Sequence, residues 1–184
     1  MKKFCYIAIL FLFFHCAKDD GTENRITNLT EIEFVKTFGG SKNDVFQSVV
    51  KSADGGYAIL GYTQSNDFDV VDKNNESFDF WVMKFSSEDS LQWNKTFGGS
   101  DDDRGYDIIA TSDGGYAILG YSKSADIDVT ENAGAQDFWM LKITADGTIS
   151  WQKTFGYSGA DSGSNAVQTS EWLFDNRCFR CYSF

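Results

Sequence analysis

Aspartate residues recur through this chain at fixed spacing, and their carboxylates are the groups most able to do chemistry. Asp67-x-Asp69 returns 59 positions later as Asp126-x-Asp128 (126 − 67). Carboxylates that converge with other oxygens at about 2.3–2.6 Å bind calcium, and paired carboxylates act as acid and nucleophile or base in glycoside hydrolysis. The same groups also accept hydrogen bonds from backbone N–H groups at the start of turns. Calcium binding, hydrolysis and turn capping are therefore the three interpretations to weigh.

The recurrence itself favours turn capping, because catalytic constellations are normally unique whereas structural turns repeat. The recurring carboxylates are Asp44/Asp103/Asp161, Asp54/Asp113, Asp67/Asp126, Asp69/Asp128 and Asp79/Asp137. Neither Asp-x-Asp pair is followed by the glycine of an EF-hand-like loop. By the same reasoning Asp101-Asp102-Asp103 is a solvated acidic turn. We predict no catalytic, metal-binding or cofactor-binding residue and a protein that is not an enzyme.

Composition excludes several further kinds of site. His15, the only histidine, lies in the leader, so a mature chain without it has no Ser/His or Cys/His catalysis and no His-ligated metal. Cys178-x-x-Cys181 has no second ligand pair, and we interpret it as accidental rather than as a redox or half zinc site. The net charge of −11 repels phosphate backbones, so we expect no nucleic-acid partner.

The N-terminus predicts export and a lipid anchor. Lys2 and Lys3 precede an apolar run, Cys5–Phe14, that is too short to span a bilayer. The run ends at Cys16, and this arrangement resembles a bacterial lipoprotein leader. The resemblance implies a signal peptide over residues 1–15, lipidation of Cys16, and a polar tether over residues 16–33. The alternative is a plain secretory leader with an incidental cysteine.

A short motif after that cysteine predicts where in the cell the lipoprotein is located. Lys18-Asp19-Asp20 resembles the acidic signal that sends some lipoproteins of one Gram-negative phylum to the cell surface. We therefore expect an outer-membrane lipoprotein exposed at the cell surface and held to the membrane through its lipid alone.

The remainder of the chain is internally repeated. Asp54–Tyr62, DGGYAILGY, recurs letter for letter at Asp113–Tyr121. TFGGS stands at Thr37–Ser41 and Thr96–Ser100, and Thr154-Phe155-Gly156 begins a third copy. Repetition at this period indicates stacked, nearly identical units rather than one unique catalytic core.

Each unit contains four strand patterns separated by turn residues, and no window outside the leader has a helical period. The predicted strands are Phe46–Lys51, Gly56–Tyr62, Asp79–Phe85 and Leu91–Phe97, then Tyr106–Thr111, Gly115–Tyr121, Asp137–Ile143 and Ile149–Phe155. Asp54-Gly55 and Asp113-Gly114 are tight-hairpin dipeptides.

The strand patterns also predict how the units pack. The third strands are apolar on both faces, whereas in the fourth strands Leu91, Trp93 and Phe97 share one face opposite polar residues. Strands buried on both sides require a sheet above and a sheet below, as in the blades of a β-propeller. A β-solenoid or a double-sheet sandwich is the alternative.

The aromatic residues fit the same packing. Those that could stack on sugars, Trp81/Trp139, Trp93/Trp151 and Tyr62/Tyr121, recur at strand positions. Their recurrence favours core packing over a ligand platform.

These residues carry a family resemblance. TFGGS-x-x-D followed by DGGYAILGYTQSNDFD resembles the bacterial β-propeller repeat family over Phe34 to about Ser170. The chain departs from that family at Asp69, where proline is common. The resemblance implies an all-β fold of tandem four-stranded antiparallel blades and implies nothing about a ligand.

Only about two blades are complete, so we expect an incomplete propeller over residues 34–170. Phe34–Phe38 is predicted as a lone fourth strand and Ser164–Thr169 as a lone first strand. Glu171–Phe184 resembles nothing upstream, and we interpret it as a frameshifted or truncated tail. Open apolar faces predict self-association of this fragment.

For function, these observations favour a surface-anchored, non-enzymatic interaction or adhesion module whose partner is an unknown protein or glycan. A carbohydrate-active enzyme or lectin-like glycan binder that uses the Asp-rich loops is the alternative.

Overall fold

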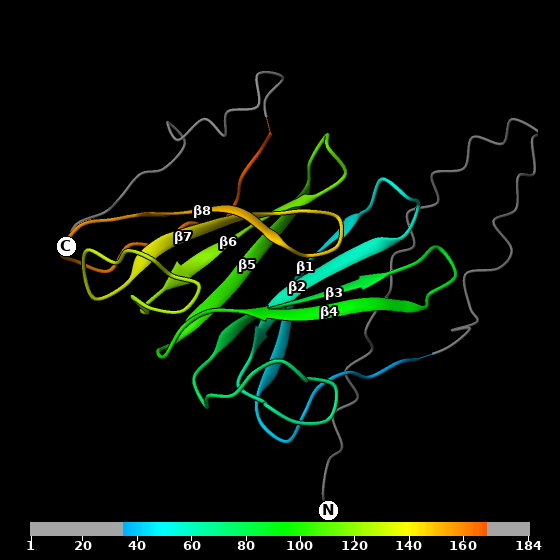
Figure 1. The fold of residues 1–184 in the computed structure, drawn as a ribbon, viewed down its shortest axis with the longest axis horizontal. Coiled ribbons are helices and arrows are strands. Elements are labelled where there is room, and N and C mark those ends of the chain that lie inside the picture. Colours follow the sequence, from blue (N-terminus) through cyan, green and yellow to red (C-terminus); the bar gives the residue numbers. More distant parts are fainter. Residues whose placement is uncertain (1–34, 169–184) are drawn as a thin grey trace, which may run out of the picture. The chain divides into compact units, whose positions relative to one another are not determined.

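The computed structural model describes residues 35–168 (Figure 1). The chain divides at Lys36/Thr37, and the fold below is that of the described residues after this point. Cys16, the remainder of the leader and the Cys178-x-x-Cys181 tail lie outside the described residues, so the predictions made for them remain predictions.

The described residues form eight antiparallel strands in two four-stranded sheets, with no helix among them. The first sheet has the order β1-β2-β3-β4 and the second β5-β6-β7-β8. The strands are β1 (Asp44–Lys51), β2 (Tyr57–Thr63), β3 (Asp79–Phe85), β4 (Leu91–Phe97), β5 (Asp103–Ala110), β6 (Tyr116–Ser122), β7 (Asp137–Ile143) and β8 (Ile149–Phe155). The all-β fold with two blade-like units is confirmed.

The Asp-Gly dipeptides make the predicted hairpins. Gly55 and Gly114 have φ of 89° and 83°, a conformation that favours glycine. The carboxylates that precede them, on Asp54 and Asp113, accept the N–H groups of Gly56 and Gly115 at 3.1 Å each. A hydrogen bond from the Thr111 hydroxyl is the largest cause that lowers the pKa of Asp113, to about 2.

Burial confirms that the central strands are covered on both faces. Every residue of β3, β6 and β7 is buried, whereas β4 and β8 are partly exposed. Trp81 and Trp139 have no exposed surface and therefore belong to the core, as their recurrence predicts. Their counterparts on the outer strands, Trp93 and Trp151, are only partly covered.

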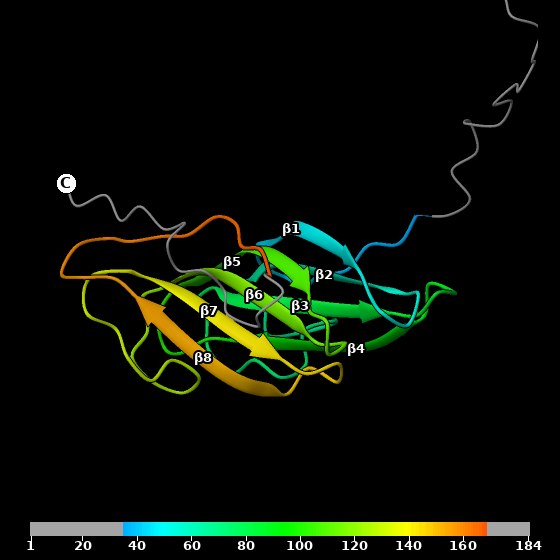
Figure 2. The same ribbon diagram turned by 90° about the horizontal axis from the view of Figure 1, so that it is seen from above.

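The two sheets stack face to face through one apolar cluster that includes Leu60 and Phe80 of the first sheet and Trp139 of the second. The Phe80 and Trp139 rings meet edge to face with centroids 4.8 Å apart. The first strand of the second sheet, β5, lies beside β1 and β2 (Figure 2). A Cβ on Gly105 of β5 would lie 2.8 Å from the Gly61 carbonyl oxygen, so this close approach requires glycine.

Polar contacts join the same sheet faces. The Ser48 hydroxyl donates to the Asp107 carboxylate at 2.8 Å, and the Ser52 and Tyr116 hydroxyls are 2.6 Å apart. The stack is therefore specified by hydrogen bonds as well as by apolar burial.

Two predictions about strands are wrong. Residues 35–38 and 164–168 form no strand, because the described chain offers neither segment a neighbouring strand whose backbone it can pair with. A register shift at the end of β3 pairs Leu91 with Phe85 and Trp93 with Lys84. Because neighbouring residues of β3 face opposite ways, Leu91 and Trp93 do not share a face.

The Asp101-Asp102-Asp103 prediction is also wrong in part. Asp101 is exposed, but Asp103 is completely buried, because it begins β5 and turns its carboxylate inward.

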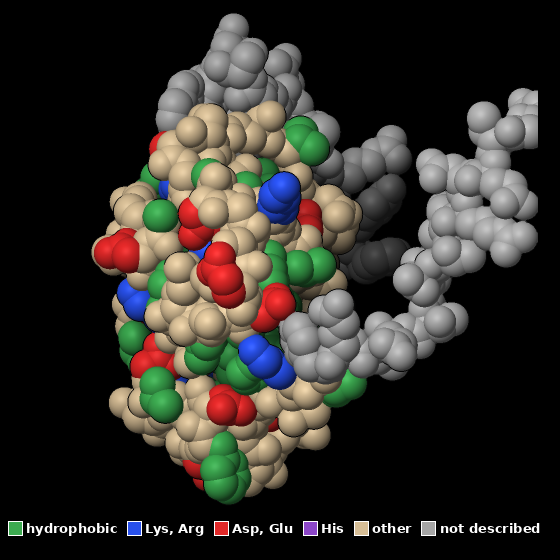
Figure 3. All heavy atoms as spheres, turned by 90° about the vertical axis from the view of Figure 1, so that its right-hand side faces the viewer, with side chains coloured by type: hydrophobic (Ala, Val, Ile, Leu, Met, Phe, Trp, Pro, Cys, Tyr) green, Lys and Arg blue, Asp and Glu red, His purple; other side chains and the backbone are tan. Residues whose placement is uncertain are grey.

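Charged side chains are scattered over the face seen in Figure 3, with Asp and Glu interspersed among Lys and Arg. Within residues 35–168 we find no helix with the length and apolar character needed to cross a membrane.

Candidate functional site

The recurring carboxylates meet at the turn that leads into each unit. The first capped turn, Gly39–Ser41, precedes β1, and the second, Gly98–Ser100, precedes β5. In the first, Gly39 N donates to Asp69 at 2.9 Å, Gly40 N to Asp44 at 2.8 Å and Ser41 N to Asp67 at 2.8 Å. In the second, Gly98 N donates to Asp128 at 3.2 Å, Gly99 N to Asp103 at 2.7 Å and Ser100 N to Asp126 at 2.8 Å. The two sets of bonds are equivalent.

The Asp-x-Asp loops reach these turns because their middle residues are left-handed. Phe68 and Ile127 have φ of 52° and 57°, and both side chains are exposed. This conformation is uncommon for bulky residues and costs energy that the surrounding bonds must offset. It leaves both carboxylates of each loop bonded to N–H groups of one turn.

Glycine at the centre of each capped turn makes room for the loop. A Cβ on Gly40 would lie 2.4 Å from both the Asp67 carboxylate and the Ser65 side chain. A Cβ on Gly99 would lie 2.4 Å from the Asp126 carboxylate and 2.5 Å from Ser124. A side chain at this position is therefore incompatible with the capped arrangement.

Ser65 and Ser124 complete the capped turns, and sequence reasoning missed both. Their hydroxyls donate to Asp44 at 3.0 Å and to Asp103 at 2.8 Å. Each hydroxyl also accepts the next N–H of the turn, from Lys42 or Asp101, at 3.0 Å. Their recurrence at a 59-residue spacing (124 − 65) was the signal that could have identified them.

The carboxylates of the capped turns thus accept backbone N–H and hydroxyl donors, as the turn-capping interpretation predicts. The Ser41 N–H is the largest cause that lowers the pKa of Asp67, whereas burial is the largest cause that raises the pKa of Asp103 and of Asp128. Within the described residues, no three His, Cys, Asp or Glu side chains are grouped so that they could hold a metal ion.

Asp79 lies behind the second capped turn and brings a second buried carboxylate to it. A Cβ on Gly98 would lie 2.8 Å from both Asp79 and Asp103. Burial raises the pKa of Asp79 to about 7, although the Lys73 ammonium 3.8 Å away lowers it. Sequence reasoning missed Lys73, whose side chain has no exposed surface, because it lies in a loop and is not repeated.

The third turn, Gly156–Ser158, has only part of this arrangement. The Tyr157 N–H donates to Asp161 at 2.9 Å, in the manner of Gly40 and Gly99. The described residues supply no Asp-x-Asp loop to Gly156 and Ser158. The residue at the centre of this turn is tyrosine instead of glycine, and its side chain is 77% exposed.

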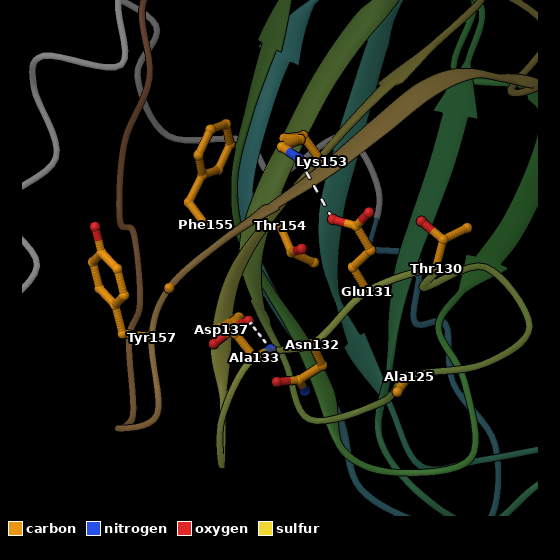
Figure 4. A pocket seen from close by; sticks show the side chains of 11 residues that line it. Ala125, Thr130, Glu131, Asn132, Ala133, Asp137, Lys153, Thr154, Phe155 and Tyr157 are labelled. Carbon is orange, nitrogen blue, oxygen red and sulfur yellow. Dashed lines mark hydrogen bonds and ion pairs between the residues drawn. The ribbon is translucent and has the colours of Figure 1, made fainter.

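A cleft of about 720 Å³ opens beside the third turn, between the β6–β7 loop and the end of β8 (Figure 4). We call it the Tyr157 cleft. Its lining residues are Ala125, Thr130, Glu131, Asn132, Ala133, Asp137, Lys153, Thr154, Phe155, Gly156 and Tyr157. In Figure 4, Tyr157 and Phe155 lie on one side and Glu131 and Thr130 on the other. The Glu131 carboxylate and the Lys153 ammonium are 3.5 Å apart.

Asp137 forms part of the wall of this cleft and is 1% exposed. Its Oδ2 atom accepts the Ala133 N–H at 2.6 Å, but its Oδ1 atom is buried without a hydrogen-bond partner. A buried acceptor without a donor costs about 1–3 kcal/mol. The wall of the cleft therefore contains one buried, unsatisfied acceptor, which lies against Gly156, since a Cβ on Gly156 would be 2.3 Å from it.

The two units differ at the cleft. Strand β6 repeats β2 closely, but Tyr157 replaces Gly99, Asn132 replaces Lys73 and Ala133 replaces Asn75. In the first unit, Asn75 donates to the Gly99 carbonyl at 2.7 Å, and the buried Lys73 ammonium donates to the Asn75 carbonyl at 2.9 Å. The second unit lacks both groups.

In the first unit, a carboxylate of the β2–β3 loop also accepts hydrogen bonds from β4. Asp72 accepts both the N–H and the hydroxyl of Thr96 at 2.9 Å. Glu131 stands in its place in the second unit and pairs with Lys153 instead.

No protein-family model and no curated protein matches this chain.

Proposed function

We propose that this protein is a surface-anchored, non-enzymatic repeat lipoprotein that acts as an interaction or adhesion module built from propeller-type blades. The observation that carries the proposal is that repeated and non-repeated residues have different positions and contacts in the structure. The repeated carboxylates cap turns, whereas several residues that break the repeat, Tyr157, Asn132 and Ala133 among them, line the Tyr157 cleft. A unique group of exposed residues on a repeated scaffold is the expected form of a recognition site.

Three features support binding rather than turnover at this cleft. Its only buried carboxylate, Asp137, accepts a backbone N–H, and its exposed carboxylate, Glu131, is paired with Lys153. The Asp-rich loops, which an enzyme of the glycoside-hydrolase type would use, are engaged in capping the turns. We infer that neither set of acids is arranged as an acid and a nucleophile for hydrolysis.

A glycan array and a panel of glycoside hydrolase substrates, both applied to the full chain, test the proposal. We expect specific retention of a ligand and no turnover. Robust turnover that a single Asp→Asn substitution abolishes would show that the protein is an enzyme.

The lipid anchor is tested separately, because Cys16 carries that part of the proposal alone. Growth with a labelled fatty acid should mark the wild type and leave Cys16→Ser unmarked. Equal labelling of both proteins would remove the lipoprotein assignment. Protease treatment of intact cells should cleave the wild type if it lies on the outer surface, whereas a chain that faces the periplasm would resist.

A further inference from the structure

We propose that the Tyr157 cleft binds a carbohydrate, with the Tyr157 ring as the surface against which one pyranose ring packs. This inference rests on the proposed function, since it names the class of ligand that the interaction module recognises. It uses none of the Asp-rich loops, whose carboxylates are engaged in the capped turns.

Tyr157 first determines what the cleft excludes. In both capped turns the central glycine lies so close to the Asp-x-Asp loop that an added Cβ would meet its atoms at 2.4 Å. A tyrosine at the equivalent position of the third turn cannot accept such a loop in the same arrangement. The cleft is therefore not a third copy of the capped turn waiting for an acidic loop, and its occupant must have a different chemistry.

The polar groups of the cleft match those of a sugar hydroxyl. A hydroxyl is one donor and also an acceptor, so it can donate to a carboxylate while it accepts from an ammonium. Glu131 and Lys153 offer such a pair, with their charged atoms 3.5 Å apart and their side chains 72% and 54% exposed.

The apolar groups of the cleft match the ring of a sugar. The Tyr157 side chain is 77% exposed, and Phe155 lies on the same side of the cleft in Figure 4. The C–H groups of a pyranose form a flat apolar surface that packs against such a ring, while the hydroxyls point to the rim. A cleft of about 720 Å³ has room for one or two pyranose rings, and ligand sites of this size are common.

The test titrates the full chain, labelled for NMR, with maltose, cellobiose, lactose and chitobiose. We expect at least one disaccharide to shift the resonances of Tyr157, Glu131 and Lys153. Tyr157→Gly restores the residue found in the capped turns and should weaken binding at least about tenfold, which corresponds to about 1.4 kcal/mol. Tyr157→Phe retains the ring and should retain most of the affinity.

Two matched controls separate the cleft from general effects. Phe68→Asn removes an exposed aromatic side chain outside the cleft, at a left-handed position that asparagine tolerates, and should leave binding unchanged. The acetylated and amidated peptide SADIDV, which has the sequence of residues 124–129, should not bind the wild type.

The possible outcomes test the carbohydrate proposal separately from the proposal that the protein is an interaction module. Failure of all four disaccharides to bind at millimolar concentration overturns the carbohydrate proposal, and so does binding of the acidic peptide in the cleft. If the wild type retains glycans on an array and Tyr157→Gly retains them equally, the interaction module stands and the cleft is the wrong site.

Discussion

The second and third turns of this protein come from the same repeat and end in different states. Gly98–Ser100 is closed by an Asp-x-Asp loop and lies at the junction of two stacked sheets. Gly156–Ser158 retains the bond to its own aspartate, Asp161, but borders an open cleft. Glycine at position 99 admits the Asp-x-Asp loop between β6 and β7, whereas the described residues supply no such loop to the third turn, and tyrosine at position 157 would exclude one in the same arrangement.

This comparison shows how a repeated scaffold acquires a unique site. The strands and the bond from the turn to its aspartate are repeated, so the geometry at the two places is nearly the same. The two places differ in a few residues of the loop and the turn, Lys73 to Asn132 and Gly99 to Tyr157 among them, and the described residues supply a capping loop to the second turn only. Function is expected where the repeat is broken.

The largest effect on stability should come from substitutions of the buried tryptophans in the two stacked sheets. Trp139 is fully buried and packs against Phe80 of the first sheet, so Trp139→Ala should lower the free energy of unfolding by about 3–5 kcal/mol. Trp81, also fully buried and stacked on Phe46, should show a loss in the same range. Denaturant titration measures both, with the 40%-exposed Trp151 as the mild control.

A loss below 1 kcal/mol at Trp81 would show that β3 is not packed on both faces. Trp139 faces the first sheet and is covered by it, so the contact between the two sheets accounts for its complete burial.

Periodicity predicted the strands well because strand faces repeat every two residues and the copies reinforce one another. The bounds of β3, β4, β7 and β8 are those expected, whereas β1 and β5 begin earlier, at Asp44 and Asp103. Those two aspartates begin strands because they accept bonds from the preceding turn, and this role depends on contacts distant in sequence.

The candidate site was much harder to predict from the sequence. Repetition identified the aspartates that cap the turns. It carried no information on the residues that differ between the Tyr157 cleft and the equivalent place in the first unit. Lys73 and Tyr157 occur once each at their positions and lie in loops, where no periodic pattern applies. The consequence of tyrosine at position 157 can be inferred only from the structure, which shows what a side chain at the equivalent Gly99 would contact.

The buried carboxylate of Asp79, behind the second capped turn, should make the stability of the protein depend on pH. Burial raises the pKa of Asp79 from 3.8 to about 7, so the folded protein binds a proton there more tightly than the unfolded chain does. Stability from this group is present below about pH 4 and is lost as the pH rises toward 7, by on the order of 3 kcal/mol.

Unfolding free energies of the wild type and Asp79→Asn, measured from pH 4 to pH 7, test this dependence. The wild type should become less stable across the window, and the substitution should flatten that slope. Burial raises the pKa of Asp103 in the same direction, so a residual slope is expected in the variant. Parallel curves for the two proteins would mean that Asp79 does not titrate there.

Exchanging the central residues of the two turns tests the comparison most directly. Gly99→Tyr places a side chain where Asp126 and Ser124 already lie, and should cost about 2–3 kcal/mol in unfolding free energy. Tyr157→Gly removes an exposed side chain and adds the backbone freedom of glycine to the unfolded chain, so it should cost less than about 1 kcal/mol. Equal effects of the two substitutions would mean that the closed turn does not depend on glycine.

The smallest contrast concerns the aspartates that both turns retain. Asp103 is fully buried and accepts the Gly99 N–H at 2.7 Å and the Ser124 hydroxyl at 2.8 Å. Asp103→Asn keeps the shape but replaces an acceptor by a donor, so it should cost about 2 kcal/mol, the usual worth of hydrogen bonds to a buried charged group. Thermal and denaturant unfolding of this variant, and of Asp161→Asn below, provide the measurement.

Asp161 provides the matched substitution at the open turn. It accepts the Tyr157 N–H at 2.9 Å and has no serine hydroxyl from an Asp-x-Asp loop among the described residues. Asp161→Asn should therefore cost less than about 1 kcal/mol, since one neutral donor at a turn beside an open cleft is at stake. If Asp161→Asn proved as costly as Asp103→Asn, the third turn would be held as firmly as the second. The openness of the Tyr157 cleft could then not be attributed to the missing loop.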